Sequence, residues 1–153
     1  MKDKLNLGCG TDILPDYVNL DYYKFQGVDV VWNVNKTPFP FKANTFSRIK
    51  AFHVIEHVES VVSIIQELFR ISKPGAIIDI EVPYYTGLNA VKDPTHKHFF
   101  AAATFDFFER GKLGKGNYFD ESEKSNFSFL YPIFRVHPIQ LIRIDLNHLI
   151  IAF

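Results

Sequence analysis

The chain has 153 residues, equal numbers of acidic and basic side chains, a formal net charge of zero at pH 7 and a single cysteine. The length predicts one domain, residues 1–153, which can bury a hydrophobic core large enough to fold without disulfide bonds or a structural metal ion. The charge balance disfavours a nucleic-acid partner held by a broad basic surface, and one cysteine excludes an intrachain disulfide or an all-cysteine metal cage. Because no apolar stretch has the length of a signal peptide or membrane helix, we expect no membrane span and a cytoplasmic location.

Short apolar runs separated by turns fill the first two-thirds of the chain. They predict strands at Lys4–Leu7, Tyr17–Leu20, Val28–Val34, Phe46–Phe52 and Ala76–Val82. Before the last of these, Glu59–Ser72 carries apolar residues at near-helical spacing, and Lys73-Pro74-Gly75 ends the predicted helix. Strands that alternate with a helix are typical of an α/β domain with a mostly parallel sheet.

The last third of the chain has a different character. Tyr84–Phe100 is predicted as a polar loop, Ala101–Arg110 as a short helix and Gly111–Ser125 as a mobile loop. Phe127–Val136 and Leu141–Phe153 are predicted as two strands that pair as an antiparallel hairpin at the C-terminal edge. The phenylalanines that cluster after residue 99 indicate core packing or a roof over a substrate pocket.

The sharpest local feature is the turn Gly8-Cys9-Gly10 at the end of the first predicted strand. Glycine permits a tight turn, and its missing side chain lets a ligand approach the backbone. Asp21 falls at the end of the next strand, where a carboxylate can accept both hydroxyls of a ribose. Ligands of open α/β sheets bind outside the carboxyl ends of the strands, so the combination indicates a nucleotide-like ligand. A plain turn with a surface aspartate is the alternative.

Further motifs follow in a fixed order, namely Asn6-Leu7-Gly8-Cys9-Gly10, Val18-Asn19-Leu20-Asp21, Pro38-Phe39-Pro40-Phe41, His53-Val54-Ile55-Glu56-His57-Val58, Lys73-Pro74-Gly75 and Asp93-Pro94-Thr95-His96. This order resembles that of small, stand-alone class I S-adenosylmethionine-dependent methyltransferases, over about residues 4–108. The resemblance implies a Rossmann-like, three-layer α/β fold with strand order 3-2-1-4-5-7-6, strand seven being antiparallel. This chain departs from it by reduced N-terminal helices, because it begins at the first strand and has few residues before the second. The resemblance also implies S-adenosylmethionine as cofactor and S-adenosylhomocysteine as its product.

Cofactor contacts are implied by the same resemblance. The backbone of Gly8, Cys9 and Gly10 would face the methionine part of the cofactor, with Asn6 in the same motif. His53, after the fourth strand, would line the methyl-donor side. A nucleophilic role for the thiol of Cys9 is not expected, because no base lies near it in sequence.

The resemblance places the adenosine half of the cofactor on the next two strands. Asp21 would hold the ribose hydroxyls, Tyr22 would stack near the adenine, and Asn33 and Val34 would meet the adenine edge at the end of strand three. Asn33 departs from the acidic residue that the family often has there, although an amide oxygen can still accept a hydrogen bond. Only Thr11–Tyr17 separates the glycine turn from the second strand, too few residues for a crossover helix. The uncovered sheet surface makes a homodimer plausible.

The segment His53-Val54-Ile55-Glu56-His57 also matches the HxxEH pattern of inverted zinc peptidases. That pattern requires one helix, whereas His53 directly follows a strand and Val58-Glu59-Ser60 is the predicted helix start. No third ligand has an evident context, so no metal is expected. We expect Glu56 and His57 to organise the strand-to-helix turn through local hydrogen bonds.

The second polar cluster, Asp93-Pro94-Thr95-His96, lies in a loop after the fifth strand. His96 or His53 could act as a general base on a substrate hydroxyl, with Asp93 orienting His96. The alternative is a proline-fixed turn in which Asp93 accepts backbone hydrogen bonds.

The sequence therefore predicts an S-adenosylmethionine-dependent methyltransferase that acts on the oxygen or nitrogen of a small-molecule acceptor, such as a sugar or a lipid-linked intermediate. The first alternative is a non-catalytic module that binds S-adenosylmethionine or S-adenosylhomocysteine. A nicotinamide-dependent Rossmann enzyme is a further alternative, but Thr11-Asp12-Ile13-Leu14-Pro15 supplies neither its third glycine nor its helix.

Overall fold

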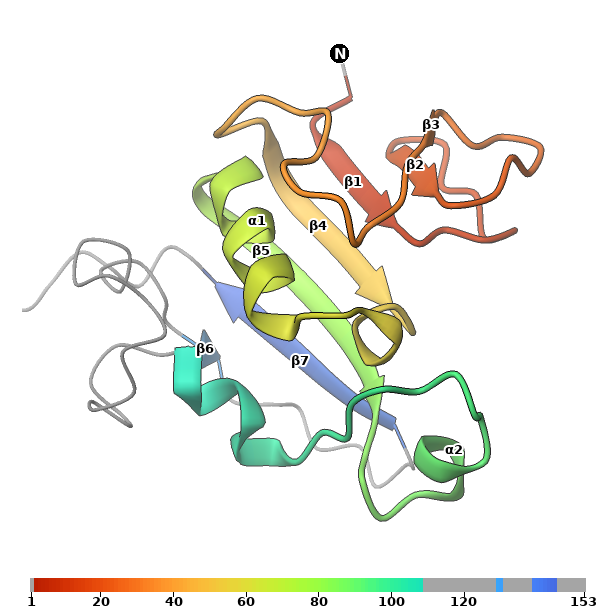
Figure 1. Cartoon of the computed structure of the whole chain (residues 1–153). Coiled ribbons are helices and arrows are strands. Elements are labelled where there is room, and N and C mark those ends of the chain that lie inside the picture. Colours follow the sequence, from red (N-terminus) through yellow and green to blue (C-terminus); the bar gives the residue numbers. More distant parts are fainter. Residues whose placement is uncertain (1, 109–128, 131–138, 146–153) are drawn as a thin grey trace, which may run out of the picture.

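Seven strands form one sheet in the order β3-β2-β1-β4-β5-β7-β6, which is the order that the resemblance implies. The computed structural model describes residues 2–108, 129–130 and 139–145 (Figure 1). Its elements in chain order are β1 (Lys4–Leu7), β2 (Val18–Asp21), β3 (Val30–Val31), β4 (Phe46–Phe52), the 3-10 turn η1 (Ile55–His57), α1 (Val61–Ile71), β5 (Ser72–Pro83), α2 (Leu88–Val91), the 3-10 helix η2 (Ala102–Phe108), β6 (Phe129–Leu130) and β7 (Ile139–Asp145).

Strands β1 to β5 run parallel to one another, so their carboxyl ends lie at the same edge of the sheet. β7 pairs antiparallel with β5, and β6 pairs antiparallel with β7. The connection between β6 and β7, the remaining residues of the two predicted C-terminal strands and the predicted loop Gly111–Ser125 lie outside the described residues. The fold is thus a mostly parallel, Rossmann-like α/β sheet.

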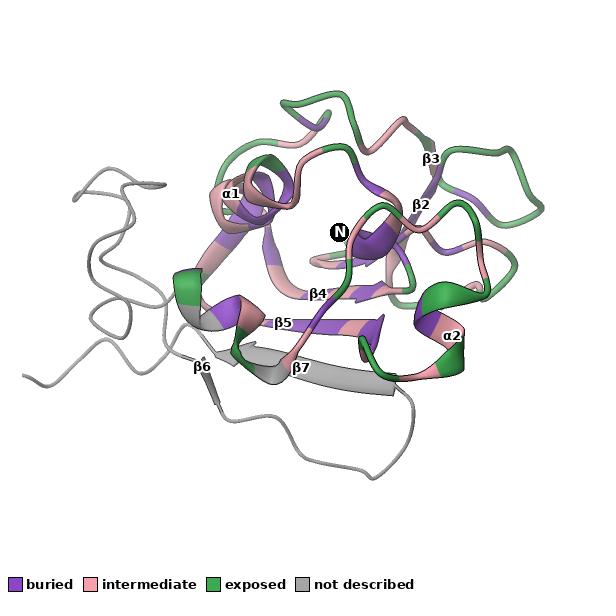
Figure 2. Cartoon of the chain, turned by 60° about the horizontal axis from the view of Figure 1, so that its bottom comes forward, coloured by how far each residue is buried: buried purple, intermediate pink, exposed green. Residues whose placement is uncertain are grey.

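The two faces of the central strands differ in polarity. The face toward α1 is apolar, and its buried residues include Leu5, Leu7, Leu20, Ile49, Ala51, Ile78 and Ile80. α1 lies on this face (Figures 1 and 2) and buries Ile64, Ile65, Leu68 and Ile71 along one side, as the near-helical spacing predicts. The opposite face carries charged pairs, in which Arg48 contacts Asp79 at 2.6 Å and Lys50 contacts Asp12 at 2.9 Å.

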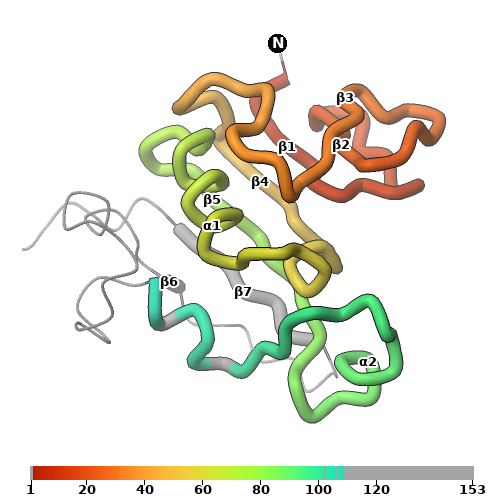
Figure 3. Tube along the Cα trace, in the orientation of Figure 1, coloured from red at the N-terminus to blue at the C-terminus, as the bar shows by residue number. Residues whose placement is uncertain are grey.

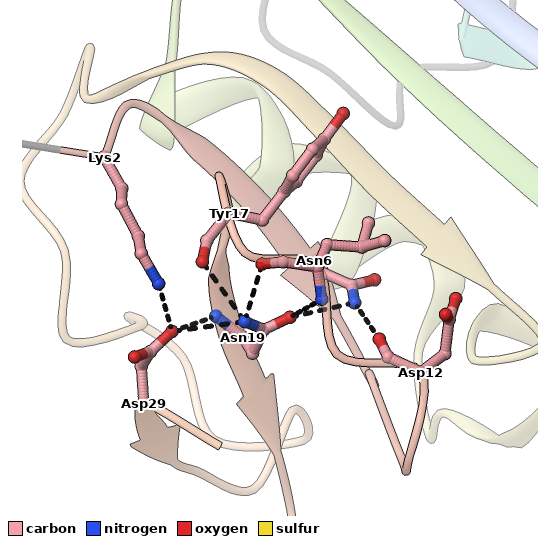
Figure 4. Close-up of polar contacts among 7 residues, drawn as sticks. Lys2, Asn6, Asp12, Tyr17, Asn19 and Asp29 are labelled. Atoms are coloured by element: carbon pink, nitrogen blue, oxygen red, sulfur yellow. Dashed lines mark hydrogen bonds and ion pairs between the residues drawn. The ribbon is translucent and has the colours of Figure 1, made fainter. Parts of the chain in front are cut away.

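Residues 8–17 connect β1 to the parallel β2 without a helix. The prediction that this crossover helix is reduced to a turn is confirmed, and the predicted third layer is a loop at this place. Two buried amides fasten the loop to the polar face (Figure 4). Asn6 donates to the carbonyl of Asp12 at 2.7 Å and to Oδ1 of Asn19 at 3.1 Å. Asn19 Nδ2 donates to the carbonyls of Leu14 and Tyr17, and its Oδ1 accepts from the Leu14 amide.

Asp29 completes this amide network from the start of β3. Its Oδ2 accepts from the backbone amide of Asn19 at 2.8 Å and from Lys2 Nζ at 3.1 Å. These bonds, first that of the Asn19 amide, lower the pKa of the Asp29 carboxyl. Because the folded-state pKa lies below the unfolded value, the stabilisation is present near neutral pH and is lost as the pH falls through the folded-state pKa. Polar bonds therefore hold the loop where an apolar helix would usually pack.

Several predicted elements differ from those of the structure. β2 spans Val18–Asp21 instead of Tyr17–Leu20. β3 has two residues instead of Val28–Val34, because only Val30 and Val31 pair with β2. The helix begins at Val61, after Ser60, whose side chain caps it by accepting from the Ser63 amide. β5 starts at Ser72, ahead of the predicted stop, because Ser72 pairs with Phe46 and the register shifts before Arg48. One helical turn, α2, lies inside the predicted polar loop.

The phenylalanines near the end of the described chain divide into two groups. Phe100, Phe105 and Phe108 are buried in the core, with the rings of Phe100 and Phe105 stacked at 5.6 Å. Phe99 and Phe107 are exposed. In the described part of the chain, no helix has the length and apolar character needed to cross a bilayer.

We predict that Asn19→Ala lowers the free energy of unfolding by about 2–3 kcal/mol, because the Leu14 amide and carbonyl lose their side-chain partner inside the protein. Asn89→Ala, a change of a half-buried asparagine on α2, is the control and is expected to alter stability by less than about 0.5 kcal/mol. Urea denaturation followed by circular dichroism measures both. Equal stabilities of the two variants would contradict the structural role of Asn19.

Candidate functional site

The glycine turn follows β1 directly and bends beside the end of β2. Both glycines have positive φ, +63° at Gly8 and +51° at Gly10, and the Cys9 amide donates to the Leu20 carbonyl at 3.0 Å. A Cβ atom on Gly8 would lie 2.2 Å from Cγ2 of Val54, whereas a Cβ atom on Gly10 would meet nothing within 4 Å. Gly8 is therefore required by packing, and the backbone at Gly10 borders open space where a ligand can approach it.

Asp21, the last residue of β2, is buried and points toward the glycine turn. Its Oδ2 accepts from the Gly10 amide at 2.8 Å, and its Oδ1 accepts from the Tyr23 amide at 2.9 Å. Each carboxylate oxygen keeps lone-pair capacity for a further donor. Asp21 thus couples the glycine turn to β2 while remaining a possible acceptor for two hydroxyl groups of a ligand.

Aromatic rings follow Asp21 along the chain. Tyr22 and Tyr23 are exposed, with their rings edge to face at 4.9 Å, and Phe25 lies beyond them. Exposed rings at this edge of the sheet offer a flat apolar surface for a planar ligand group. The stacking role of Tyr22 stays a prediction.

The expected place of Asn33 and Val34 at the end of the third strand was wrong. β3 ends at Val31, and both residues lie in the loop that follows, because only two residues of this edge strand pair with β2. The Asn33 side-chain oxygen accepts from the Asn35 amide at 2.9 Å in a local turn. Asn6 is also predicted to contact the cofactor. Its side-chain nitrogen donates to the Asp12 carbonyl and to Asn19, so Asn6 holds the loop that begins with the glycine turn.

His53 lies where β4 ends, with φ at +56°, a left-handed conformation that is uncommon for a residue with a side chain. The Glu81 carbonyl fixes its backbone by accepting from its amide at 2.8 Å. Its half-exposed ring lies between two carboxylates, with Nδ1 3.3 Å from Glu56 Oε1 and Nε2 3.2 Å from Glu81 Oε1. Backbone strain of this kind clusters at functional sites.

The second histidine group forms where the loop after α2 meets η1. The Lys97 amide donates to the Glu56 carbonyl at 2.8 Å, and the nearby His98 ring donates from Nε2 to the Val58 carbonyl at 2.8 Å. Figure 3 traces this segment from α2 past the turn that precedes α1. As a result, the rings of His57 and His96, far apart in sequence, lie edge to face with centroids 4.7 Å apart.

Asp93 contacts Thr95 more closely than it contacts His96. The Thr95 amide and hydroxyl donate to Asp93 Oδ1 at 2.8 and 2.7 Å, whereas His96 Nε2 is 3.9 Å from Asp93 Oδ2, too far for a hydrogen bond. The bonds from Thr95 lower the pKa of the Asp93 carboxyl. The Thr95 hydroxyl lies 3.0 Å from His57 Nδ1, so Asp93 positions His57 through Thr95.

Residues that the sequence reasoning missed include Thr95 and Glu81. Thr95 follows an aspartate by two residues, which is a known turn pattern that places a hydroxyl beside the carboxylate. Glu81 is the tenth residue of β5, and nothing in its local sequence marks it as a partner of His53.

A groove of about 470 Å³ lies between the start of α1, the segment after His96 and η2. Apolar residues dominate its lining, which includes Val61, Val62, Phe99, Phe100, Phe107 and Phe108, with Lys97, His98 and Thr104. The glycine turn and Asp21 are not part of this lining. The groove is therefore separate from the turn, and His98 is the histidine that lines it.

Family and structural comparisons agree with this geometry. A family model described as a methyltransferase domain matches residues 2–124. The chain belongs to this methyltransferase family. No curated protein is similar enough in sequence to match the chain.

Three solved structures illustrate the likeness in fold. An S-adenosylmethionine-dependent methyltransferase from Archaeoglobus fulgidus is 14% identical, with a TM-score of 0.65 over 93% of this chain and 85% of the other. A chain from the complex that contains the Trm112 methyltransferase activator of Haloferax volcanii is 12% identical, with a TM-score of 0.64 over 96% and 84%. The Burkholderia thailandensis 1,6-didemethyltoxoflavin-N1-methyltransferase, solved with S-adenosylhomocysteine, is 10% identical, with a TM-score of 0.61 over 94% and 70%.

Cys9 gives a direct test of the site's electrostatics. Burial, with a smaller contribution from the Asp21 carboxylate, raises the pKa of the Cys9 thiol to about 11. At pH 8 only about one thiol in a thousand is then a thiolate, against about a quarter for an ordinary cysteine. We predict that iodoacetamide alkylates the folded protein at pH 8 at least about a hundredfold more slowly than the urea-unfolded chain. Mass spectrometry follows the reaction, and similar rates in both states would contradict the buried, protonated thiol.

Proposed function

We propose that the protein catalyses S-adenosylmethionine-dependent methyl transfer to a small-molecule acceptor. The observation that supports this most directly is the meeting of an open backbone turn at Gly10 with the buried carboxylate of Asp21. Both lie at the carboxyl edge of the sheet, and the chain belongs to a family of methyltransferase domains. In such sheets ligands bind at this edge.

The residues present fit the cofactor. The space beside Gly10 admits its methionine part, Asp21 can accept the ribose hydroxyls, and Tyr22 offers an exposed ring to the adenine. Val34, in the loop that follows β3, is partly buried against the core, and Asn33 precedes it in the same loop. When bound, the cofactor supplies a methyl group on a positively charged sulfur that a nucleophile can displace.

His53 and His96 are the proposed groups for the acceptor side. The ring of His53 lies between the carboxylates of Glu56 and Glu81, which orient it at the end of β4. In His96, Nδ1 donates to the Ala90 carbonyl at 2.9 Å, so the lone pair of the neutral ring is on Nε2, the form that a general base requires. Asp93 acts as a positioning residue for His57, because it holds the Thr95 hydroxyl that contacts the His57 ring.

The acceptor is proposed to carry a hydroxyl or amine group attached to an apolar portion. The apolar groove that begins beside His98 supports this, because its phenylalanine lining suits a lipid-linked molecule better than a free sugar. The predicted cytoplasmic location and homodimer belong to the same proposal.

The alternative function is a non-catalytic module that binds the cofactor. Two departures from the family favour it: residues 8–17 are too few to form a crossover helix, and Asn33 stands where the family often has an acidic residue. Calorimetry with S-adenosylhomocysteine tests binding, and a labelled methyl donor with a panel of hydroxyl and amine acceptors tests turnover. Binding without transfer to any acceptor would favour the module, and absence of binding would reject both functions.

We predict that Asp21→Asn weakens S-adenosylhomocysteine binding by at least about tenfold, and that Asp21→Ala abolishes it. Each charge-assisted hydrogen bond from a ribose hydroxyl contributes about 1.5–3 kcal/mol. Asp16→Asn, a change of an exposed aspartate before β2, is the matched control and is expected to leave affinity unchanged. Calorimetry measures affinity, and circular dichroism checks the fold. Unchanged affinity in a folded Asp21→Asn variant would remove the ribose assignment.

We predict that His96→Ala lowers turnover about a hundredfold while S-adenosylhomocysteine affinity stays within about threefold, since general-base groups contribute about 10²–10⁴-fold in rate. Turnover is measured with whichever hydroxyl or amine acceptor from the panel above is first found to be methylated. Equal loss of turnover and affinity, or loss of neither, would exclude His96 as the base.

A further inference from the structure

Three metal-ligating side chains lie together beside His53. One carboxylate oxygen of Glu56 and one ring nitrogen each of His57 and His96 all lie within 4.8 Å of one another. Glu56 and His57 belong to η1, whereas His96 comes from the loop after α2. No metal is expected from the sequence, because no third ligand for Glu56 and His57 is evident in it, whereas the fold brings His96 to them.

The hydrogen bonds around both histidines leave the same nitrogen free. His96 Nδ1 faces the Ala90 carbonyl, which can only accept, so this nitrogen carries the hydrogen. The Thr95 hydroxyl donates to Asp93, so toward His57 Nδ1 it acts as an acceptor, as does the Thr95 carbonyl at 3.4 Å. In the neutral rings both lone pairs are therefore on Nε2. Metal-ligating histidines show this arrangement, with the second nitrogen donating to a carbonyl, hydroxyl or carboxylate partner.

Glu56 provides an independent indication of a ligand. Its side chain is 1% exposed, Oε1 lies 3.3 Å from His53, and Oε2 is buried with no hydrogen-bond partner. A buried carboxylate oxygen without a partner is costly, whereas a bound cation satisfies it. The backbone carbonyl of Glu56 accepts from the Lys97 amide, which ties the carboxylate's own turn to the loop that carries His96.

We propose that Glu56, His57 and His96 form a binding site for a divalent transition-metal ion, with Zn²⁺ as the expected occupant. Two imidazoles and one carboxylate are a donor set that suits Zn²⁺ and disfavours Mg²⁺ or Ca²⁺, which prefer oxygen ligands. Bond lengths of about 2.0–2.2 Å place the ligand atoms about 3–3.5 Å apart, so small side-chain rotations must close the site. Three protein ligands leave a coordination position for a water or hydroxyl oxygen.

The site adjoins the acceptor side of the proposed function, and only its chemical consequence rests on that function. A hydroxyl oxygen at the open position would become more acidic beside the ion. In the metal-bound protein His96 Nε2 is a ligand, and the base role proposed above for His96 describes the metal-free protein. Binding of the ion is measured without any acceptor, so failure of the metal site and failure of methyl transfer are distinguishable.

The test uses the full chain, stripped of metal with a chelator and titrated with Co²⁺ as a coloured substitute for Zn²⁺. We expect visible d–d absorption that saturates at one Co²⁺ per chain and disappears when Zn²⁺ is added. Glu56→Gln, His57→Gln and His96→Gln are each expected to weaken binding by at least about a hundredfold. Thr95→Val, which removes the hydroxyl behind His57, is expected to weaken it about tenfold, since partners behind a ligand contribute about 10–100-fold in affinity.

His98→Gln is the matched control, because His98 lies two residues from His96 and glutamine can still donate to the Val58 carbonyl. Its Co²⁺ affinity is expected to stay within about threefold. Where a variant does not fold by circular dichroism, the wild-type protein gives a second measurement: Zn²⁺ should protect His57 and His96 from diethyl pyrocarbonate, with mass spectrometry locating the modified rings. Absence of Co²⁺ binding, equal affinity in the ligand variants, loss in the control, or unprotected rings would each overturn the proposal.

Discussion

The arrangement of the site depends on the hydrogen bonds of one buried amide, that of Asn19. Its side chain is bonded to Leu14, Tyr17 and Asn6, and its backbone amide to Asp29 (Figure 4). These bonds hold a connection that is too short for a crossover helix against the polar face of the sheet. Because the connection begins with the glycine turn, the same bonds set where that turn lies relative to the end of β2. Burial of an amide is favourable only when its bonds are made, so the loop has few alternative positions.

Two chemically different groups meet at the carboxyl edge of the sheet. On β1 and β2 the turn and Asp21 offer backbone and a carboxylate, which suit an adenosyl ligand. Beyond β4, the histidines and Glu56 offer lone pairs and a buried negative charge. Because β1 to β5 are parallel, the two groups lie at one edge of the sheet although they are distant in sequence. The glycine turn and the histidine segment follow two neighbouring strands of the sheet, β1 and β4.

Much of the fold could be predicted because its signals are local. β1 and β4 have the predicted bounds, since each is an apolar run that a turn ends. The length of β3 and the early start of β5 could not be predicted, because they depend on which residues of neighbouring strands pair. α2 is a single turn, too short to show a period.

The candidate site was predictable only in part, for the same reason. Asp21 and the glycine turn follow strands directly, and their closeness follows from parallel pairing. The meeting of His57 with His96 depends instead on the bonds of Lys97 to Glu56 and of His98 to Val58, which connect segments that no sequence pattern relates. The contact of Glu81 with His53 likewise depends on the pairing of β5 with β4, and that of Thr95 with His57 on the approach of two distant segments.

The left-handed backbone of His53 has a consequence for the engineering of this protein. At φ of +56° a glycine would relieve local strain that a histidine endures. Replacement of His53 by glycine would therefore release backbone strain, but it would also remove the ring that lies between Glu56 and Glu81. Because His53 is one of the groups that we propose for the acceptor side, stabilisation of the chain by design should leave position 53 untouched.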